Sequence, residues 1–332
     1  MRHAPGDRVD RYEILELLGE GAYAETYKAR DTTTGQTVVL KSPNPLLFAD
    51  PALHQRFLRE TEIASHLDHP GVQRSLDPGS TRSEPYLVLE YVDGRNLRRA
   101  MREYEGPVPV DVAVDWGRQL AEALAYLHRQ GIVHRDLKPE NILVTDGESA
   151  NGRLKIADFG TAMLTGARRL TWRHLSESLG TPDYMSPEQI QGNRGDDRSD
   201  IYAWGVLLYE LLTGRVPFEG DNWLAVMAGH LRRTPTPIRR FRPEVRLALE
   251  AVVLTAMRRY PEHRYPSADA LLADLSRLDS LDPAAFDLSP EEPMGGMAAA
   301  ESARRLWMFV ALIALGFIAV VAVIITLSVV LR

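Results

Sequence analysis

Four side chains that could carry chemistry lie close together in the middle of the chain. Asp136, Lys138 and Asn141 fall within the run HRDLKPEN, and Asp158 follows in the run DFG. A carboxylate can orient a hydroxyl and receive its proton, and an ammonium can offset the charge of phosphate oxygens. An amide and a second carboxylate supply the hard oxygen ligands that Mg²⁺ prefers. Together these residue types predict transfer of a phosphoryl group from Mg-ATP to a hydroxyl.

The two runs resemble, letter for letter, the catalytic loop and the metal-binding loop of protein kinases. The alternative is an ordinary polar turn, which an ordered match of this length disfavours. The resemblance implies that Asp136 is the catalytic base and that Lys138 supports the transferred phosphate. It also implies that Asn141 and Asp158 hold Mg²⁺.

A glycine-rich turn with Gly19 and Gly21 lies between two strand-like runs, and Lys41 follows in the run VVLK. Alone, such a turn is weak evidence, because a plain hairpin gives the same pattern. With the lysine it resembles the kinase loop that covers the ATP phosphates, together with the lysine that binds them. The chain has Ala24 where the family has a third glycine, a change expected to affect nucleotide affinity rather than chemistry.

A helical pattern over residues 53–67 contains two candidate partners for Lys41, namely Glu60 and Glu62. In kinases such a glutamate holds the lysine on the ATP phosphates. The interval to the turn at His69-Pro70 resembles the family and favours Glu60. For Glu62 a solvated helix face is the better interpretation.

The run YLVLEYV, residues 86–92, resembles the strand and hinge that join the two lobes of a kinase. The resemblance implies that the backbones of Glu90 and Val92 meet the adenine edge and that Leu143 packs under the ring. A buried strand is the simpler interpretation of the same run, and both can hold at once.

Lys138 and the later run GTPDY, which contains Thr181, resemble serine/threonine kinases more than tyrosine kinases. The resemblance gives two further residues structural roles. Glu188 is expected to pair with a buried Arg264, and Asp200 is expected to anchor the backbone of the catalytic loop.

An arginine directly before the catalytic aspartate, here Arg135, is usually neutralised by a phosphorylated activation segment in this family. The candidate acceptors are Thr171, Ser176 and Ser178, and the choice among them stays open. Control by autophosphorylation, with a possible dimerisation partner, is therefore predicted.

Composition limits the alternatives. The chain has 332 residues, with 45% hydrophobic and 25% charged side chains, typical of a globular protein of two lobes. Its formal net charge of −6 argues against nucleic-acid binding. It has no cysteine, which excludes disulfides and thiolate chemistry. The N-terminal residues lack the apolar core of a secretory signal.

The hydrophobic pattern predicts an α+β fold with two lobes. After an N-terminal tail, residues 1–11, a β-rich N-lobe covers residues 12–90 and a larger helical C-lobe covers residues 91–278. The C-lobe helices are expected at residues 110–130, 201–213, 247–260 and 267–278. The second of these is apolar nearly all round, as a central helix would be.

The C-terminal part changes character twice. Residues 279–303 contain prolines, glycines and carboxylates without Lys or Arg, which predicts a disordered acidic linker beside the membrane. Residues 306–331 carry no charge and are long enough for a transmembrane helix. Because a kinase needs cytosolic ATP, we expect a single-pass protein of the cell membrane with the kinase domain in the cytoplasm and the C-terminus outside.

The resemblance covers about residues 12–278 and, with the linker and span, is closest to membrane-anchored bacterial Hanks-type serine/threonine kinases. It implies ATP and Mg²⁺ as cofactors and proteins carrying Ser or Thr as substrates. A pseudokinase that binds nucleotide and acts as a membrane scaffold is the alternative. The chain keeps all the residues that degenerate kinases tend to lose, namely Lys41, Glu60, Asp136, Lys138, Asn141 and Asp158. A small-molecule or lipid kinase is disfavoured by the run from Gly180 to Glu188.

Overall fold

The computed structural model describes residues 3–20, 24–43, 67–76, 82–146, 151–159, 163–164 and 182–294. The chain forms two compact units, residues 1–291 and residues 292–332. All described helices and strands belong to the first unit.

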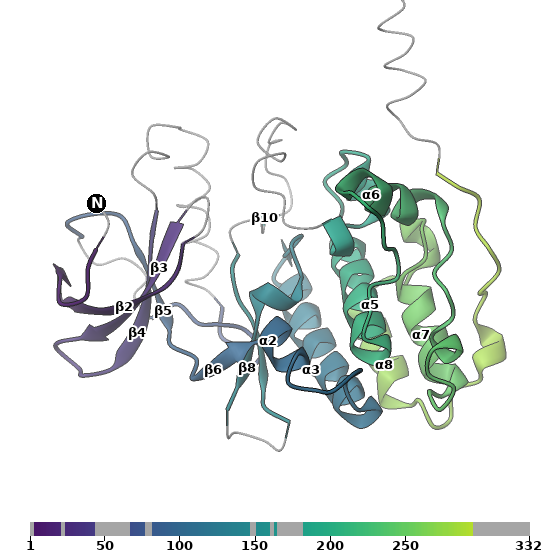
Figure 1. The fold of residues 1–332 in the computed structure, drawn as a ribbon, viewed down its shortest axis with the longest axis horizontal. Helices are drawn as coiled ribbons and strands as arrows, with labels where there is room; N and C mark the ends of the chain where they lie inside the picture. The colour runs from purple at the N-terminus through teal and green to yellow at the C-terminus, as the bar shows by residue number, and fades with distance from the viewer. Residues whose placement is uncertain are drawn as a thin grey trace, which may run out of the picture. The chain divides into compact units, whose positions relative to one another are not determined.

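An antiparallel five-stranded sheet forms the N-terminal part of this unit (Figure 1). Its strands follow one another in chain order: β1 (Arg8–Val9), β2 (Tyr12–Glu20), β3 (Ala24–Asp31), β4 (Thr37–Pro43) and β5 (Leu87–Glu90). Tyr12 and Ile14 are buried on β2 and Glu13 between them is partly exposed, the alternation expected of a strand with one covered face. They pack with Tyr27, Leu40 and Val88 in the core of the sheet.

The rest of the unit is mainly helical. Its helices are α2 (Leu97–Met101), α3 (Val110–Arg129), α4 (Pro187–Ile190), α5 (Asp197–Thr213), α6 (Trp223–Arg232), α7 (Leu247–Ala256) and α8 (Ala268–Ser276). Its short strands are β6 (Gly94–Asn96), β7 (Ile132–Val133), β8 (Ile142–Thr145), β9 (Leu154–Ile156) and β10 (Met163–Leu164). Single 3₁₀ turns lie at η1 (Pro139–Asn141), η3 (Pro182–Tyr184), η4 (Ile238–Arg240), η5 (Pro261–His263) and η6 (Pro283–Ala285).

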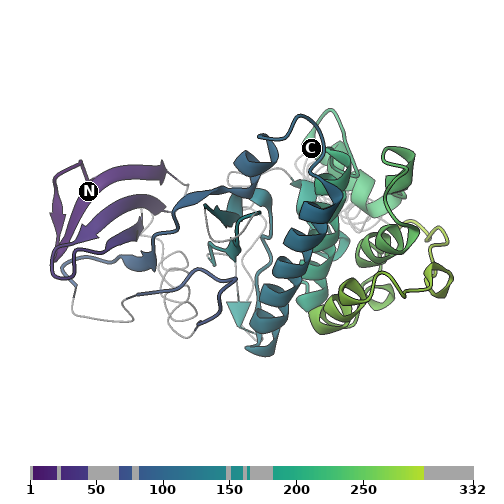
Figure 2. The same ribbon diagram turned by 90° about the horizontal axis from the view of Figure 1, so that it is seen from below.

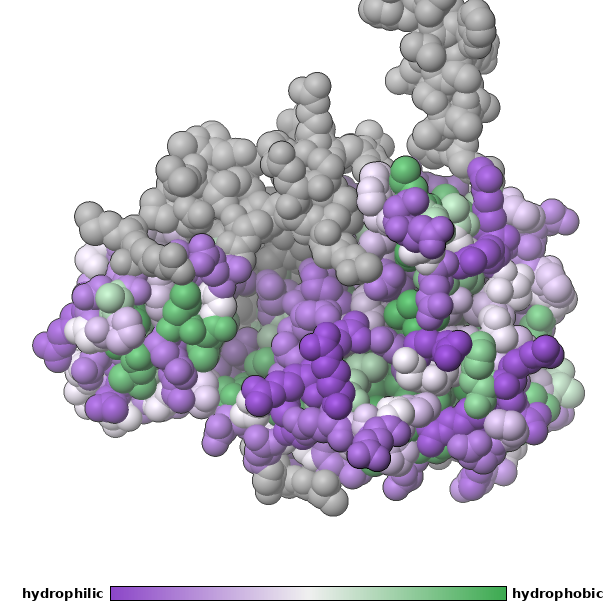
Figure 3. Space-filling model, in the orientation of Figure 1, coloured by the Kyte–Doolittle hydropathy of each residue, from purple (hydrophilic) through white to green (hydrophobic). Residues whose placement is uncertain are grey.

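Helices α3 and α5 form the centre of this helical part, with α7 and α8 packed outside them (Figure 2). Helix α5 is buried at every position from Ser199 to Thr213, as the apolar pattern predicts. It begins where the Asp196 side chain accepts a hydrogen bond from the Arg198 backbone. It ends at Gly214, whose φ of 73° suits a residue without a side chain. Hydrophilic side chains cover most of the helical part in Figure 3.

The prediction of a small β-rich lobe followed by a larger helical lobe is confirmed. The helices predicted at residues 110–130 and 267–278 are found as α3 and α8. Helix α5 begins earlier than expected because Asp196 caps it. Helix α7 stops at Ala256, before Pro261, which could not continue it. The helix predicted at residues 53–67 lies, but for Leu67, outside the described residues.

Residues 279–291 differ from the expected disordered linker. Leu281 and Phe286 pack against the helical core. The Glu291 carboxylate lies 3.1 Å from Arg258 Nε and accepts a hydrogen bond from the Arg259 backbone nitrogen at 2.6 Å. The Arg259 guanidinium donates to the Glu291 carbonyl at 2.7 Å. The acidic composition suggested a solvated segment, but these arginines supply the opposite charge and the two apolar side chains find a covered surface.

Within the residues that the structure describes, no helix is both long and apolar enough to cross a bilayer. The predicted span, residues 306–331, lies outside them.

The expected pair of Glu188 and Arg264 is confirmed and is buried. Arg264 Nη1 and Nη2 donate to the two carboxylate oxygens of Glu188 at 2.8 and 2.7 Å, and Ser199 Oγ donates to one of them at 2.6 Å. Burial alone would raise the pKa of Glu188, but the hydrogen bonds and charge of Arg264 lower it below its ordinary value. The pair ties α4 to the chain after α7.

We predict that Arg264→Met lowers the free energy of unfolding by about 3–5 kcal/mol, because Glu188 would stay buried without its cation. The measurement is urea denaturation followed by circular dichroism. The matched control is Arg129→Met, which removes an exposed pair with Asp269 and should cost less than about 1 kcal/mol. Equal losses in the two variants would contradict a structural role for the buried pair.

Candidate active site

The HRDLKPEN run forms a loop between β7 and β8, and a buried carboxylate from α5 anchors it. Asp200 is 1% exposed. Its Oδ2 accepts a hydrogen bond from the His134 backbone nitrogen at 2.8 Å, and its Oδ1 accepts one from Arg135 at 2.7 Å. The anchoring role expected for Asp200 is therefore confirmed.

The Asp200 carboxylate has a third partner that the sequence reasoning missed. Its Oδ2 lies 2.9 Å from Nε2 of His128, near the end of α3. Burial alone would lower the pKa of His128, but the hydrogen bond and charge of Asp200 raise it above its ordinary value. Burial alone would raise the pKa of Asp200, but His128 and the backbone donors lower it. Nothing in the helical pattern of residues 110–130 separates this histidine from an ordinary residue at a helix end.

Two residues of the site have backbones in the left-handed region. Arg135 has a φ of 67° and Asp158 has a φ of 62°. Such a conformation costs a residue with a side chain roughly 1–2 kcal/mol, so the surroundings must hold it. Asp200 holds the first through the Arg135 amide. Next to the second, the Ala157 amide donates to the Asn141 carbonyl at 2.9 Å, which ties the two loops together.

The three side chains of the HRDLKPEN loop that were predicted to carry chemistry, those of Asp136, Lys138 and Asn141, lie together. Lys138 Nζ lies 2.8 Å from Asp136 Oδ2, and Asn141 Nδ2 lies 3.1 Å from the same oxygen. Asn141 Nδ2 also donates to the Asp136 carbonyl at 2.8 Å. Because the amide nitrogen faces Asp136, the amide oxygen is the atom of Asn141 left to serve as a metal ligand. The Asp136 carboxylate is partly exposed and so accessible to a substrate.

Lys41 on β4 reaches the second loop from the β-rich lobe. Its Nζ lies 2.9 Å from Asp158 Oδ1, and the Asp158 side chain is 51% exposed. Glu60, the expected partner of this lysine, lies outside the described residues, as does Gly21. Gly19, the last residue but one of β2, pairs with Thr26 of β3, with open space where a side chain would begin.

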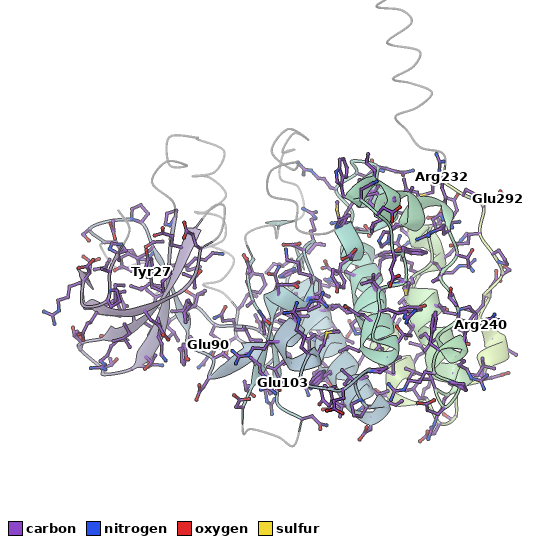
Figure 4. All side chains as sticks on the ribbon, viewed as in Figure 1. Tyr27, Glu90, Glu103, Arg232, Arg240 and Glu292 are labelled. Atoms are coloured by element: carbon purple, nitrogen blue, oxygen red, sulfur yellow. The ribbon has the colours of Figure 1, made fainter. Side chains whose placement is uncertain are left out.

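The predicted hinge follows β5. Glu90 ends this strand opposite Val38 of β4, and Val92 follows it, partly exposed. Figure 4 shows Glu90 where the chain leaves the β-rich lobe for β6. Leu143 lies on β8, paired with Asn96 of β6, and is also partly exposed.

The residues present suit Mg²⁺ only in combination with a phosphate ligand. Among the described residues, no group of three or more His, Asp or Glu could form a metal cage. Asp158 and Asn141 together offer two hard oxygen ligands, and Mg²⁺ commonly takes its others from water and substrate phosphates.

An arginine of the short helix α2 fixes the turn that ends the catalytic loop. Arg98 donates to Glu140 at 2.9 Å, to Glu210 of α5 at 2.6 Å and to the Tyr184 hydroxyl. A cavity of about 550 Å³ opens beside this arginine. Asp183 lines this cavity. Its burial, and to a lesser extent the negative charge of Glu210, raise the pKa of Asp183 to about 6.

Comparisons with known proteins agree with this geometry. Residues 12–273 match the protein kinase domain family. The chain is 40% identical over 269 residues to the probable serine/threonine-protein kinase SCO3848 of Streptomyces coelicolor, covering 80% of this chain and 39% of that protein. It is 37% identical over 293 residues to the serine/threonine-protein kinase PknB of Mycobacterium tuberculosis, covering 87% and 45%.

A solved structure is also similar. The PknI kinase domain of Mycobacterium tuberculosis superposes with a TM-score of 0.63 at 26% identity, over 83% of this chain and all of that one. The chain belongs to the protein kinase family, and its matched region is similar to the corresponding region of bacterial serine/threonine-protein kinases. The chain spans less than half the length of these curated relatives.

Proposed function

We propose that this chain transfers the γ-phosphoryl group of ATP to serine and threonine hydroxyls of proteins. The observation that carries the proposal is the group formed by Asp136, Lys138 and Asn141, with 2.8 and 3.1 Å between their side chains. This group stands on a loop that a buried carboxylate anchors, so its geometry is fixed before a substrate arrives.

Each group has a role in this reaction. Asp136 Oδ2 accepts the proton of the substrate hydroxyl as its oxygen attacks the γ-phosphorus, and the bond to the β-phosphate oxygen breaks. Lys138 offsets the negative charge that the phosphate oxygens carry beside this carboxylate. Asn141 and Asp158 would hold Mg²⁺, which neutralises the phosphates when bound.

The nucleotide is assigned to the side of Asp158 that Lys41 of β4 contacts. Lys41 Nζ contacts the Asp158 carboxylate, and we propose that Lys41 binds the ATP phosphates while an ion pair with Glu60 holds it in place. Gly19 and Gly21 would cover the phosphates. The backbones of Glu90 and Val92 would meet the adenine, and Leu143 would lie under it.

The chain is also proposed to phosphorylate itself. The Arg135 side chain is partly buried, and its buried Nε and Nη1 atoms have no hydrogen-bond partner among the described residues. A phosphate on the activation segment would satisfy them. The candidate acceptors Thr171, Ser176 and Ser178 lie outside the described residues, and a second copy of the chain could serve as the partner in this reaction.

A membrane tether completes the proposal. Residues 306–331 have the length and apolarity of a single span, and Arg304 and Arg305 precede them. Since ATP is cytosolic, the kinase domain would face the cytoplasm and the C-terminus would lie outside.

We predict that Asp136→Asn lowers turnover by about two to four orders of magnitude, the usual contribution of a positioned general base. The affinity for ATP should change little, because the nucleotide is assigned to other residues. The measurements are phosphate incorporation into a generic protein acceptor with Mg-ATP, with the sites mapped by mass spectrometry, and the Kd of ATP by calorimetry.

The matched control is Asp111→Asn, which changes an exposed carboxylate in the first turn of α3 and should leave both values unchanged. Turnover by the Asp136 variant equal to that of the control would remove Asp136 from its assigned role. ATP binding without phosphate transfer by the unaltered chain would favour the scaffold alternative.

The tether is tested by carbonate extraction of membranes from cells that express the chain. We expect the full chain in the membrane pellet and a chain ending at Ala303 in the supernatant, with phosphate transfer retained. A full-length Ile318→Lys variant is the matched control and should be extracted more readily, because a lysine at the centre of a span costs roughly 2.5–3.5 kcal/mol. Release of the unaltered full chain by carbonate would contradict the tether.

A further inference from the structure

A short extended segment, residues 72–76, lies between β9, which leads to Asp158, and β5, which leads to the predicted hinge, and it pairs with both strands. Val72 forms a parallel bridge with Ile156 of β9, and Ser75 forms an antiparallel bridge with Leu89 of β5. The Gln73 backbone nitrogen donates to the Ile156 carbonyl at 2.9 Å. Two residues beyond Ile156 comes Asp158, so this segment has one side on the metal-binding loop and the other on the end of β5.

Gln73 is the buried polar side chain of this segment that reaches the hinge. It is 6% exposed, and its Nε2 donates to the backbone carbonyl of Glu90 at 3.0 Å. A buried amide needs such a partner, so its position is well determined. Among the described residues, Gln73 is the one whose side chain donates a hydrogen bond to the Glu90 carbonyl, the group assigned to adenine.

Glu90 is held on its other sides as well. Its backbone nitrogen donates to the Arg74 carbonyl at 2.9 Å. Its carboxylate accepts a bond from the Arg74 backbone nitrogen at 3.0 Å and from Lys155 Nζ at 2.8 Å. The amide and carbonyl of Glu90 therefore both face the segment of Gln73 and away from β4, so the carbonyl has a defined direction.

We propose that Gln73 is a base-positioning residue, which fixes the Glu90 carbonyl as an acceptor for the exocyclic amino group of adenine. This inference rests on the proposed function. A carbonyl oxygen has two lone pairs. Gln73 occupies one of them, and the second is left in a fixed direction for a donor on the base. Guanine presents an oxygen at the corresponding position, so the same carbonyl disfavours it.

A purely structural role for the bond would make a different prediction. If Gln73 only joined two segments, its loss would lower stability and turnover together. As a positioning residue it changes the affinity for the base, with little effect on the chemical step.

The test compares Gln73→Leu with Ser75→Ala in the purified full-length chain. Leucine is similar in size and cannot donate. Ser75 is the matched control, because its Oγ donates from the same segment to a carbonyl of β5, that of Val88, at 3.3 Å. The measurements are the Kd of ATP and of GTP by calorimetry, kcat and KM for ATP, and the thermal midpoint Tm.

We expect Gln73→Leu to raise the Kd and KM for ATP about three- to tenfold, the equivalent of one hydrogen bond, with kcat nearly unchanged. The preference for ATP over GTP should narrow, and Ser75→Ala should match the unaltered chain. Gln73→Asn, whose shorter amide cannot reach the carbonyl, should show the same loss of affinity and serves if the leucine variant does not fold.

Unaltered ATP affinity in both Gln73 variants would overturn the inference and leave the proposed function standing. Parallel losses of kcat and Tm with the ATP to GTP ratio preserved would also overturn it, in favour of a structural role. An unaltered chain that binds neither nucleotide would overturn the proposed function itself.

Discussion

The buried carboxylate of Asp200 is the constraint on which the site depends. An ionised group taken out of water is stable only with partners, and Asp200 finds them in two backbone amides and one imidazole. If the loop left its position, the carboxylate would stay buried without those donors, a change that costs several kcal/mol. That cost exceeds the roughly 1–2 kcal/mol of strain at Arg135, so the left-handed backbone persists.

The same helix anchors two other functional segments. Ser199, beside Asp200, donates to the buried Glu188 and so joins the Glu188–Arg264 pair to α5. Near the other end of α5, Glu210 binds Arg98, which also bonds to Glu140 in the turn that ends the catalytic loop. Helix α5 thus packs through apolar side chains and bonds to neighbouring segments through Ser199, Asp200 and Glu210. Because these three polar side chains are buried, each needs a hydrogen-bond partner, and this need fixes the segment that supplies it.

Much of this arrangement could be predicted from the sequence. The ordered motifs identified the loops, and the hydrophobic periodicity identified α3, α5 and α8. The pairing of Glu188 with Arg264 and the anchoring of the catalytic loop by Asp200 followed from the family resemblance, whereas the contact of Asp200 with His128 did not. These features depend on residue type and spacing, which a sequence shows directly.

Contacts between segments distant in the sequence could not be predicted in the same way. The bond from Gln73 to the Glu90 carbonyl depends on how residues 72–76 pair with β5 and β9, and no local pattern shows it. The acidic stretch that ends at Glu291 has the composition of a disordered linker, but Arg258, just after α7, pairs with the Glu291 carboxylate, and Arg259 bonds to the same residue. The predictions for Gly21, Glu60 and the activation segment remain predictions, because those residues lie outside the described structure.

The measurement that tests the central constraint most directly is hydrogen exchange of the unaltered chain, resolved to the amides of His134 and Arg135. If the buried carboxylate of Asp200 holds both, their N–H groups should exchange only when the whole unit unfolds, far more slowly than those of the exposed loop at residues 219–222. Exchange of the two amides as fast as that loop, in the folded protein, would contradict the account, because the catalytic loop would then be free of its anchor.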